Sequence, residues 1–438
     1  MKAVKFGGTS MSTVESIRTV KNIIMSEPER RFVVVSAPGK APGENKMTDM
    51  LAEVYKAEPS KRGEVFSLVK ARFITLVNGL GLKENLLDDE FAEIEGRLSN
   101  ASYDYIVSRG EYLCAKMLAE YIGYDFVDAE GMVVFRSGSF YDDECTERRC
   151  AEALKKYGRA VVPGFYGSDP NGNIVTFSRG GSDITGAIVA RAVGASVYEN
   201  FTDVDGFMTC DPRTVPHAAL LDIVTYDELR ELAYMGANVL HPESIFPVRK
   251  ANIPIHILNT FNLGSIGTKI VPTDDFLAGK YECKRRSPIT AIAGKRDFYS
   301  LYLDKTMMNT EVGFIRKVLS CFERFGISVE HVPSGIDSMT VVFSAVDDNT
   351  ANALIDAVKT EVNPDHISLT TDIALIAIVG HGMKSRPGTA ARAISRLSTA
   401  NINLRMIDQG ASEINIILGV SNADFERALV ALNGEFEV

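Results

Sequence analysis

Short apolar runs recur through the first part of the chain, and several of them are hydrophobic on both faces. They are AVKF from Ala3, RFVVVSAP from Arg31, RAVVPGFYG from Arg159, SVYENFTDV from Ser196 and NIPIHILN from Asn252. Strands of this kind form parallel sheets that helices cover on both sides. Amphipathic stretches such as MTDMLAEVYKA and GEYLCAKMLAEYIG lie between the runs. We therefore predict an α/β/α sandwich with a mainly parallel central sheet over residues 1–285, with a helical excursion over 46–108 that covers one edge.

A polar, proline-containing linker, YECKRRSPIT from Tyr281, marks a change of pattern. Beyond it the order strand, helix, strand, strand, helix, strand occurs twice, which predicts two ferredoxin-like units over 298–372 and 373–438. The second unit stops almost directly after its last helix, and a surplus strand over 289–297 precedes the first unit. We predict that the surplus strand completes the sheet of the second unit.

Charge and composition exclude several classes of partner. A net charge of −10 argues against nucleic acid and anionic membranes, which attract basic surfaces. No apolar run approaches the length of a membrane span, and the start shows no signal-peptide pattern. The six cysteines form no CxxC pair. We expect a cytoplasmic protein with reduced thiols and no structural metal site.

The first candidate site is VKFGGTS, a strand that ends on Gly7 and Gly8 with Lys5 beside them. The following STVE, Ser12 to Glu15, has the capping-box pattern of a helix start. Unhindered glycine N–H groups, a lysine and a helix N-terminus together suit a phosphate. The P-loop and dinucleotide glycine patterns are both absent. A plain glycine turn with a lysine at a strand edge explains the segment equally well.

The second candidate site is SRGGSDITGA, in which Ser182 and Asp183 are residue types that cap helices. Arg179 precedes the glycines and can bind a carboxylate through two hydrogen bonds. A structural cap alone leaves the arginine and the two glycines unexplained, so this pattern favours a functional site.

Three further segments are ambiguous when they are taken alone. NFTDVDGFMTCDPR holds three aspartates that also suit turns, SRGEYL places Glu111 at an expected helix start, and LHPESI supplies His241 in a loop. Each has a structural explanation that is at least as simple as a functional one.

Taken in order, KFGGTS, SRGE, RGGSD, TDVDG, DPR and VLHP resemble the aspartate kinases of the amino-acid kinase family, and the two ferredoxin-like units resemble their ACT domains. The resemblance covers essentially the whole chain. It is to the monofunctional enzymes, which have no homoserine dehydrogenase extension. It implies ATP-dependent phosphorylation of the β-carboxylate of L-aspartate to 4-phospho-L-aspartate, which opens the route to lysine, threonine, methionine and diaminopimelate. The acceptor carboxylate is ionised at neutral pH, so the enzyme needs charge neutralisation and positioning, with no general base.

The resemblance also assigns roles to residues. It implies that Lys5 stabilises the transferring phosphoryl group beside the Gly7 and Gly8 N–H groups, and that Asp183 orients Lys5 or the metal environment. The aspartate-binding residues that it implies are Thr48, Glu111, Arg179 and Ser182, with Glu111 meeting the α-ammonium and Arg179 a carboxylate. The ATP-binding residues that it implies are Ser10, Thr202, Asp203, Phe207, Met208, Arg213 and Asn238. Mg²⁺ is expected to bridge the ATP phosphates, with no side chain assigned as its ligand.

Two positions depart from the family pattern. Asn238 stands in GANVLHP where many members have lysine, and Met208 stands where many have tyrosine. These departures predict altered ATP contacts and leave Lys5, Arg179 and Asp183 untouched. A sister kinase acting on another carboxylate, and an amino-acid sensor with a lapsed kinase domain, are the alternative interpretations.

ACT pairs resemble amino-acid sensors that bind an effector between subunits. We therefore expect feedback inhibition by lysine, threonine or both, in a homodimer or homotetramer formed through the ACT domains. The residues expected to contact the effector are Met308, Gly313, Phe314, Ile315, Val329, Glu330 and Asp337. The PSGIDS loop departs at Gly335 and Ile336 from the best-known lysine-sensing pattern, so the identity of the effector stays open.

Overall fold

A computed structural model describes residues 1–137, 140–178, 180–237, 240, 242–283 and 287–436. The chain divides into two compact units. The first unit comprises residues 1–207, 220–233 and 238–284, and the second comprises 208–219, 234–237 and 285–438. Among the described helices, none is long and apolar enough to cross a bilayer.

An eight-stranded sheet forms the centre of the first unit, with the order β10-β12-β11-β9-β1-β2-β6-β3. Its neighbouring strands are parallel, apart from the antiparallel pair β11–β12. The prediction of a mainly parallel central sheet is confirmed. The strands are β1 (Lys2–Phe6), β2 (Arg30–Val35), β3 (Asp125–Phe126), β6 (Ala160–Pro163), β9 (Val197–Thr202), β10 (Ile223–Thr225), β11 (Ile255–Asn259) and β12 (Thr268–Val271).

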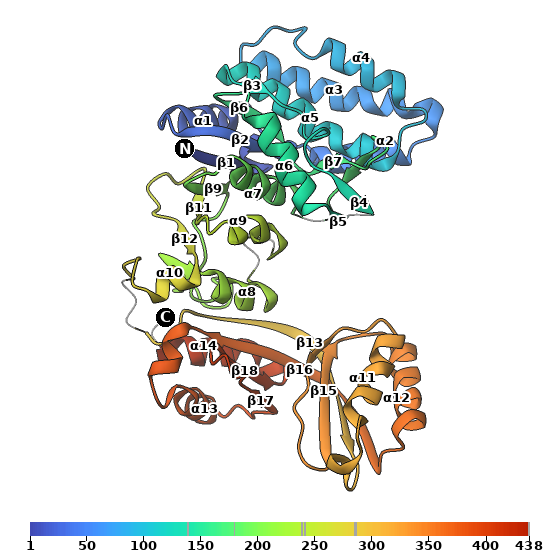
Figure 1. Ribbon diagram of the computed structural model, residues 1–438, viewed down its shortest axis with the longest axis vertical. Helices are drawn as coiled ribbons and strands as arrows, with labels where there is room; N and C mark the ends of the chain where they lie inside the picture. The colour runs from blue at the N-terminus through green and yellow to red at the C-terminus, as the bar shows by residue number, and fades with distance from the viewer. Residues whose placement is uncertain (138–139, 179, 238–239, 241, 284–286, 437–438) are drawn as a thin grey trace. The chain divides into compact units, whose positions relative to one another are not determined.

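Helices cover this sheet, and the central strands are buried along most of their length. Helix α5 packs on β2, β3 and β6 and also contacts α1, whereas α7 packs on β1, β2 and β9 and also contacts α6 and α9 (Figure 1). The excursion between β2 and α5 is helical, as expected. The helices are α1 (Val14–Met25), α2 (Met47–Lys56), α3 (Arg62–Gly79), α4 (Asp88–Arg97), α5 (Tyr103–Ile122), α6 (Asp143–Leu154), α7 (Gly181–Ala192), α8 (Tyr226–Tyr234), α9 (Phe246–Lys250) and α10 (Thr273–Leu277).

Two predicted helix starts are displaced. The capping box of α1 is formed by Thr13 and Ser16 instead of Ser12 and Glu15, because the 3-10 turn η1 (Thr9–Met11) occupies the preceding residues. Helix α5 begins after the N-cap Ser102, so Glu111 lies inside the helix and not at its start.

A six-stranded sheet with the order β14-β15-β13-β16-β18-β17 forms the second unit. The strands are antiparallel and comprise β13 (Ala291–Asp304), β14 (Val329–His331), β15 (Ser338–Ser344), β16 (His366–Val379), β17 (Met406–Asp408) and β18 (Asn415–Val420). Residues 291–295 of β13 pair with 375–379 of β16. The surplus strand must make this pairing if it completes the sheet of the second repeat.

Two hydrophobic cores support this sheet. Helices α11 (Phe314–Arg324) and α12 (Asp348–Val362) contribute to one, and α13 (Thr389–Thr399) and α14 (Phe425–Phe436) contribute to the other. The excursion over 208–219 adds Cys210, Val215 and Ala218 to the core of the second repeat.

Candidate active site

Lys5 and Asp183 form an ion pair beside the carboxyl end of β1. The Lys5 Nζ lies 2.6 Å from Asp183 Oδ1, and Lys5 is only 7% exposed. Lys5 stands opposite Asn200 of β9 in the parallel register, so both side chains leave the same face of the sheet. Asn200 donates a hydrogen bond of 2.8 Å to the same Asp183 oxygen, and the Tyr198 hydroxyl donates to the Asp183 carbonyl at 3.1 Å. Asp183 of α7 therefore holds the lysine ammonium directly, and two residues of β9 hold Asp183 in turn.

The glycines after β1 serve close contacts within the backbone. The Gly7 N–H donates to the Phe201 carbonyl at 3.2 Å, so the expectation of an unhindered amide there is wrong. The Gly39 N–H donates to the Gly8 carbonyl at 2.7 Å, and a Cβ on Gly39 would lie 2.6 Å from the Gly8 carbonyl carbon. A Cβ on Gly7 would lie 3.6 Å from Lys5 Nζ. Glycine at these positions thus keeps two loops in contact and leaves room around the ammonium.

Glu111 is a buried carboxylate in the middle of α5. It is 5% exposed and lies near the Ala37 N–H. Burial raises the pKa of Glu111 to about 8, although the Ala37 N–H and the Arg109 guanidinium act in the opposite direction. Within the described part of the chain, its Oε2 has no hydrogen-bond partner. A buried oxygen without a partner indicates a place for a donor supplied by a ligand.

Thr48 and Ser182, the other described residues of the expected aspartate site, lie in the first turns of helices. Thr48 is half-buried in α2. Ser182 follows the N-cap Gly180 of α7, so the cap is the glycine and not Ser182 or Asp183. Ser182 is buried against Gly164. A Cβ added at Gly164 would lie 2.7 Å from the Cβ of Ser182. Arg179 lies outside the described residues.

Phe165 is a residue of this region that the sequence analysis missed. Its φ of 79° is unusual for a side chain of this size, and backbone strain of this kind concentrates at functional sites. The Phe165 N–H donates to Thr185 Oγ1 at 3.2 Å, which ties it to α7. With Phe177 and Ser178 it lines a pocket of about 580 Å³. A positive φ at a phenylalanine leaves no signal in the sequence.

The expected ATP-binding residues fall into separate environments. Asp203 follows β9 and accepts from Thr9 Oγ1 at 3.1 Å and from Thr202 Oγ1 at 3.3 Å, with all three side chains near solvent. Ser10 has no exposed surface, and its hydroxyl shares a hydrogen bond of 2.7 Å with Thr260, so it anchors the loop after β1 instead of facing a ligand. Neither Thr9 nor Thr260 was expected at the site from the sequence.

The other expected ATP-binding residues that the structure describes are buried or belong to the second unit. Phe207 is 1% exposed and its N–H donates to Thr268 Oγ1 at 2.9 Å, which leaves its ring no surface to offer a nucleotide. Met208 belongs to the second unit and packs against the core of the second repeat. Arg213, also in the second unit, is exposed and pairs with Asp211 at 2.8 Å. Asn238 and His241 lie outside the described residues.

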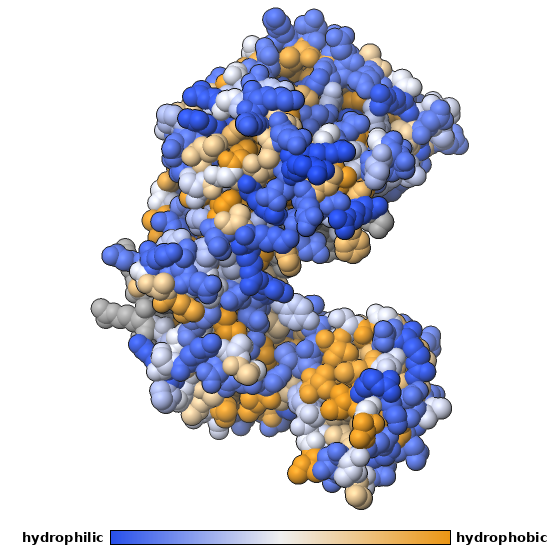
Figure 2. Space-filling model, in the orientation of Figure 1, coloured by the Kyte–Doolittle hydropathy of each residue, from blue (hydrophilic) through white to orange (hydrophobic). Residues whose placement is uncertain are grey.

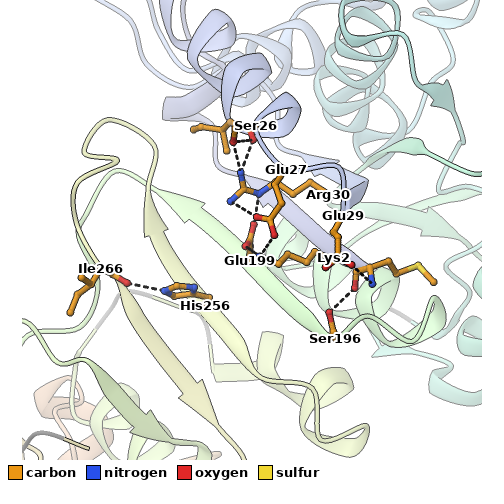
Figure 3. Close-up of polar contacts among 11 residues, drawn as sticks. Lys2, Ser26, Glu27, Glu29, Arg30, Ser196, Glu199, His256 and Ile266 are labelled. Atoms are coloured by element: carbon orange, nitrogen blue, oxygen red, sulfur yellow. Dashed lines mark hydrogen bonds and ion pairs between the residues drawn. The ribbon is translucent and has the colours of Figure 1, made fainter. Parts of the chain in front are cut away.

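A buried ion-pair network, also missed by the sequence analysis, joins the strands that carry Lys5 and Asn200. Glu199 of β9 is 2% exposed and accepts from Lys2 at 2.8 Å and from Arg30 at 2.7 Å (Figure 3). Burial alone would raise the pKa of Glu199, but hydrogen bonds from Arg30 and Lys2 outweigh burial and hold it below its usual range. Glu199 stands opposite Val4, so it leaves the face of the sheet opposite to Lys5 and Asn200. The network fixes β1, β2 and β9 to one another from behind the site.

The expected effector residues gather at the first repeat. Gly313 is the left-handed N-cap of α11, Phe314 and the nearby Met308 are buried, and Ile315 is 40% exposed. Val329 and Glu330 lie on β14.

The two charged effector candidates differ: the Glu330 carboxylate has hydrogen-bond partners, whereas Asp337 is bonded through its backbone carbonyl. Glu330 accepts hydrogen bonds from the Tyr234 hydroxyl and, at 3.3 Å, from Ser344 Oγ. The exposed Asp337 accepts from the Lys305 N–H through its carbonyl at 2.8 Å, which keeps the 333–338 loop beside the start of this region.

Family models match both parts of the chain. The model of the amino acid kinase family matches residues 1–259, and an ACT domain model matches residues 376–436. Two crystal structures of E. coli aspartokinase III, one with aspartate and ADP and one with lysine and aspartate, have TM-scores of 0.78 and 0.74 over at least 99% of each chain. At 24% and 23% identity they show that the fold is shared.

Two proteins with higher sequence identity match the chain from end to end. Aspartokinase 3 of Bacillus subtilis is 37% identical over 456 residues, spanning 100% of this chain and 98% of the relative. The crystal structure of Clostridium acetobutylicum aspartate kinase, described as an allosteric enzyme, is 39% identical with a TM-score of 0.91 over the full length of both chains. The chain therefore belongs to the amino acid kinase family, as an aspartokinase, an ATP-dependent phosphotransferase with a C-terminal ACT region.

Proposed function

We propose that the enzyme transfers the γ-phosphoryl group of ATP to the β-carboxylate of L-aspartate, giving 4-phospho-L-aspartate for lysine, threonine and methionine synthesis in the cytoplasm. The observation that carries the proposal is the buried Lys5–Asp183 pair at the carboxyl end of β1, next to two glycines. In doubly wound α/β sheets, ligands bind at this edge of the strands. The acceptor is already an anion, so the barrier is the approach of two negative groups.

Lys5 is suited to lower that barrier. An ammonium group has three donors, and Asp183 accepts one of them in the described structure. The remaining donors serve the oxygens of the phosphoryl group as it passes between donor and acceptor. Because Asp183 holds the ammonium and Asn200 holds Asp183 before the reaction, little reorganisation is needed at the moment of transfer.

Glu111 is proposed to bind the α-ammonium of aspartate. Its Oε2, without a partner in the described residues, is the acceptor that such a group needs. Arg179, Ser182 and Thr48 are proposed to hold the carboxylates. The first turns of α2 and α7 place Thr48 and Ser182 at helix N-termini, which favour anions.

Mg²⁺ is proposed to accompany ATP. Among the described residues, no group of three or more acidic, histidine or cysteine side chains could hold a metal unaided. Mg²⁺ commonly binds phosphate oxygens and waters with one or two carboxylates, so a nucleotide-borne ion with Asp183 or Asp203 nearby fits this donor set. When bound, it neutralises phosphate charge. Lys5 and its partners perform the positioning that the chain itself supplies.

Feedback control by lysine, threonine or both is proposed for the ACT region. E. coli aspartokinase III has been solved with lysine. In this chain, the first repeat exposes apolar side chains beside the expected effector residues: Met307, Val312, Ile315 and Ile336. Figure 2 shows apolar side chains gathered on the surface of this repeat. We propose that a second subunit covers them, in a homodimer or homotetramer.

Trapping of the acyl phosphate with hydroxylamine tests the proposal. We expect product with aspartate and ATP, none with glutamate, none without an acceptor, and a decrease when lysine or threonine is added. Product with glutamate at a similar rate would indicate a sister kinase. No product with either acceptor would refute the phosphotransfer, and a rate unchanged by both amino acids would refute the feedback.

A further inference from the structure

The loop between β2 and α2, residues 36–46, touches three parts of the candidate active site. The Ala37 N–H acts on the Glu111 carboxylate and lowers its pKa, and a Cβ on the adjacent Gly110 would lie 2.8 Å from the Ala37 side chain. The Gly39 N–H donates to the Gly8 carbonyl at 2.7 Å, and the Pro38 carbonyl accepts from the Met47 N–H at 3.0 Å, one residue before Thr48. The position of this connecting loop therefore sets the places of Gly8, Glu111 and Thr48 relative to one another.

Arg72 of α3 holds the connecting loop at both ends. Its Nη2 donates to the Gly39 carbonyl at 2.6 Å, and its Nη1 donates to the Asn45 carbonyl at 2.6 Å. Its Nε lies 2.6 Å from Glu44 Oε2. The Arg72 side chain is 4% exposed, whereas that of Glu44 is 44% exposed. One guanidinium thus joins α3 to the residue that contacts Gly8 and to the residues that lead into α2.

The burial of this cation shows that polar contacts hold the loop. Burial lowers the pKa of Arg72, and the Glu44 carboxylate raises it. A buried charge is unfavourable unless it is paired. Arg72 is paired through the two carbonyls at Nη1 and Nη2 and through the Glu44 carboxylate, although its buried Nε makes no hydrogen bond within the described residues. Between the loop, α2 and α3 lies a surface cavity of about 670 Å³, lined in part by Glu44, Asn45 and Met50.

We propose that Arg72 is a positioning residue for aspartate binding: it fixes the connecting loop so that Ala37 orients Glu111 and Thr48 stays in place. The proposal rests on the proposed function, because it takes Glu111 and Thr48 as aspartate ligands. Arg72 acts through the backbone of the loop. Its effect is expected on aspartate much more than on ATP.

Arg72→Lys tests the proposal, since a single ammonium cannot reproduce the fork that reaches two carbonyls and Glu44. We expect the aspartate KM to rise about tenfold while the ATP KM stays within about twofold, because small displacements of binding groups are costly. Arg62→Lys is the matched control. Arg62 lies on the same helix, is also buried, and donates to the carbonyls of Tyr55, Leu98 and Ala101, outside the connecting loop. The Arg62→Lys substitution is expected to lower thermal stability and to leave the aspartate KM unchanged.

A folded Arg72→Lys enzyme with an unchanged aspartate KM overturns the proposal. An equal rise of the aspartate KM in Arg72→Lys and Arg62→Lys also overturns it. If Arg72→Lys fails to fold, Glu44→Gln is the deciding variant, because it alters only Glu44, the half-exposed partner of Arg72. We expect the aspartate KM of Glu44→Gln to rise about threefold. An unchanged aspartate KM overturns the proposal. The native enzyme is assayed beside each variant. If it forms no acyl phosphate from aspartate, the proposed function fails, and calorimetry of aspartate binding to the same variants then tests Arg72 separately.

Discussion

The ionisation of Glu111 should make aspartate binding depend on pH. Burial raises its pKa to about 8, so at pH 7 roughly nine tenths of the free enzyme carries a protonated Glu111. If Glu111 binds the α-ammonium of aspartate, as proposed, the ligand favours the ionised form, and binding at pH 7 releases the proton. We expect the aspartate KM to fall about tenfold for each pH unit up to about pH 8 and to level off above it.

Calorimetry of aspartate binding in buffers of different ionisation enthalpy measures the proton directly. The native enzyme should release about 0.9 proton per aspartate at pH 7, and Glu111→Gln should release none. The ATP KM, measured over the same pH range, serves as the control and should stay flat. An aspartate KM that is independent of pH between about 6 and 8, or a slope that Glu111→Gln retains, would refute the reasoning.

Three further outcomes follow from the site and its supports. Lys5→Ala should reduce turnover by more than tenfold, a loss of at least about 1.4 kcal/mol, with an unchanged circular dichroism spectrum; a variant that keeps more than a tenth of the activity removes Lys5 from its role. Gly39→Ala should lower stability by about 1–3 kcal/mol and reduce activity, since its Cβ meets the Gly8 backbone, whereas Gly63→Ala, which meets nothing, should do neither. Glu199→Ala should cost about 3 kcal/mol in urea unfolding at pH 7, because it leaves Lys2 and Arg30 without their buried partner. Because the folded-state pKa of Glu199 is depressed, this difference should shrink as the pH falls below about 4.5, and an equal difference at pH 7 and pH 3 would contradict it.

Sequence pattern alone predicted the layers of the fold. Runs that are apolar on both faces, such as RFVVVSAP, identified strands of a covered parallel sheet, because burial on both sides demands that composition. The helix starts were harder to place. Ser12 and Thr13 are both competent caps, and the choice between them depends on the turn over Thr9–Met11, which Ser10 anchors to the distant Thr260.

Candidate site residues could be named from the sequence where a motif carries them, and the residues that support them could not. Lys5 and Asp183 stand in recognisable segments, whereas Asn200, Ala37 and Arg72 act through contacts between residues far apart in the sequence. Such contacts follow from the register of β1 with β9 and from the path of the connecting loop. Propensity and local spacing contain no information about either.

The long strands β13 and β16 have a practical consequence for dividing the molecule. A fragment that begins at Phe298 would lack residues 291–295 and expose the backbone edge of 375–379, which invites pairing with other chains. A fragment that ends before residue 285 would keep Cys210, Val215 and Ala218 but lose the core that buries them. No single cut at either position therefore keeps both the paired edge of β16 and the core around Cys210, Val215 and Ala218 complete.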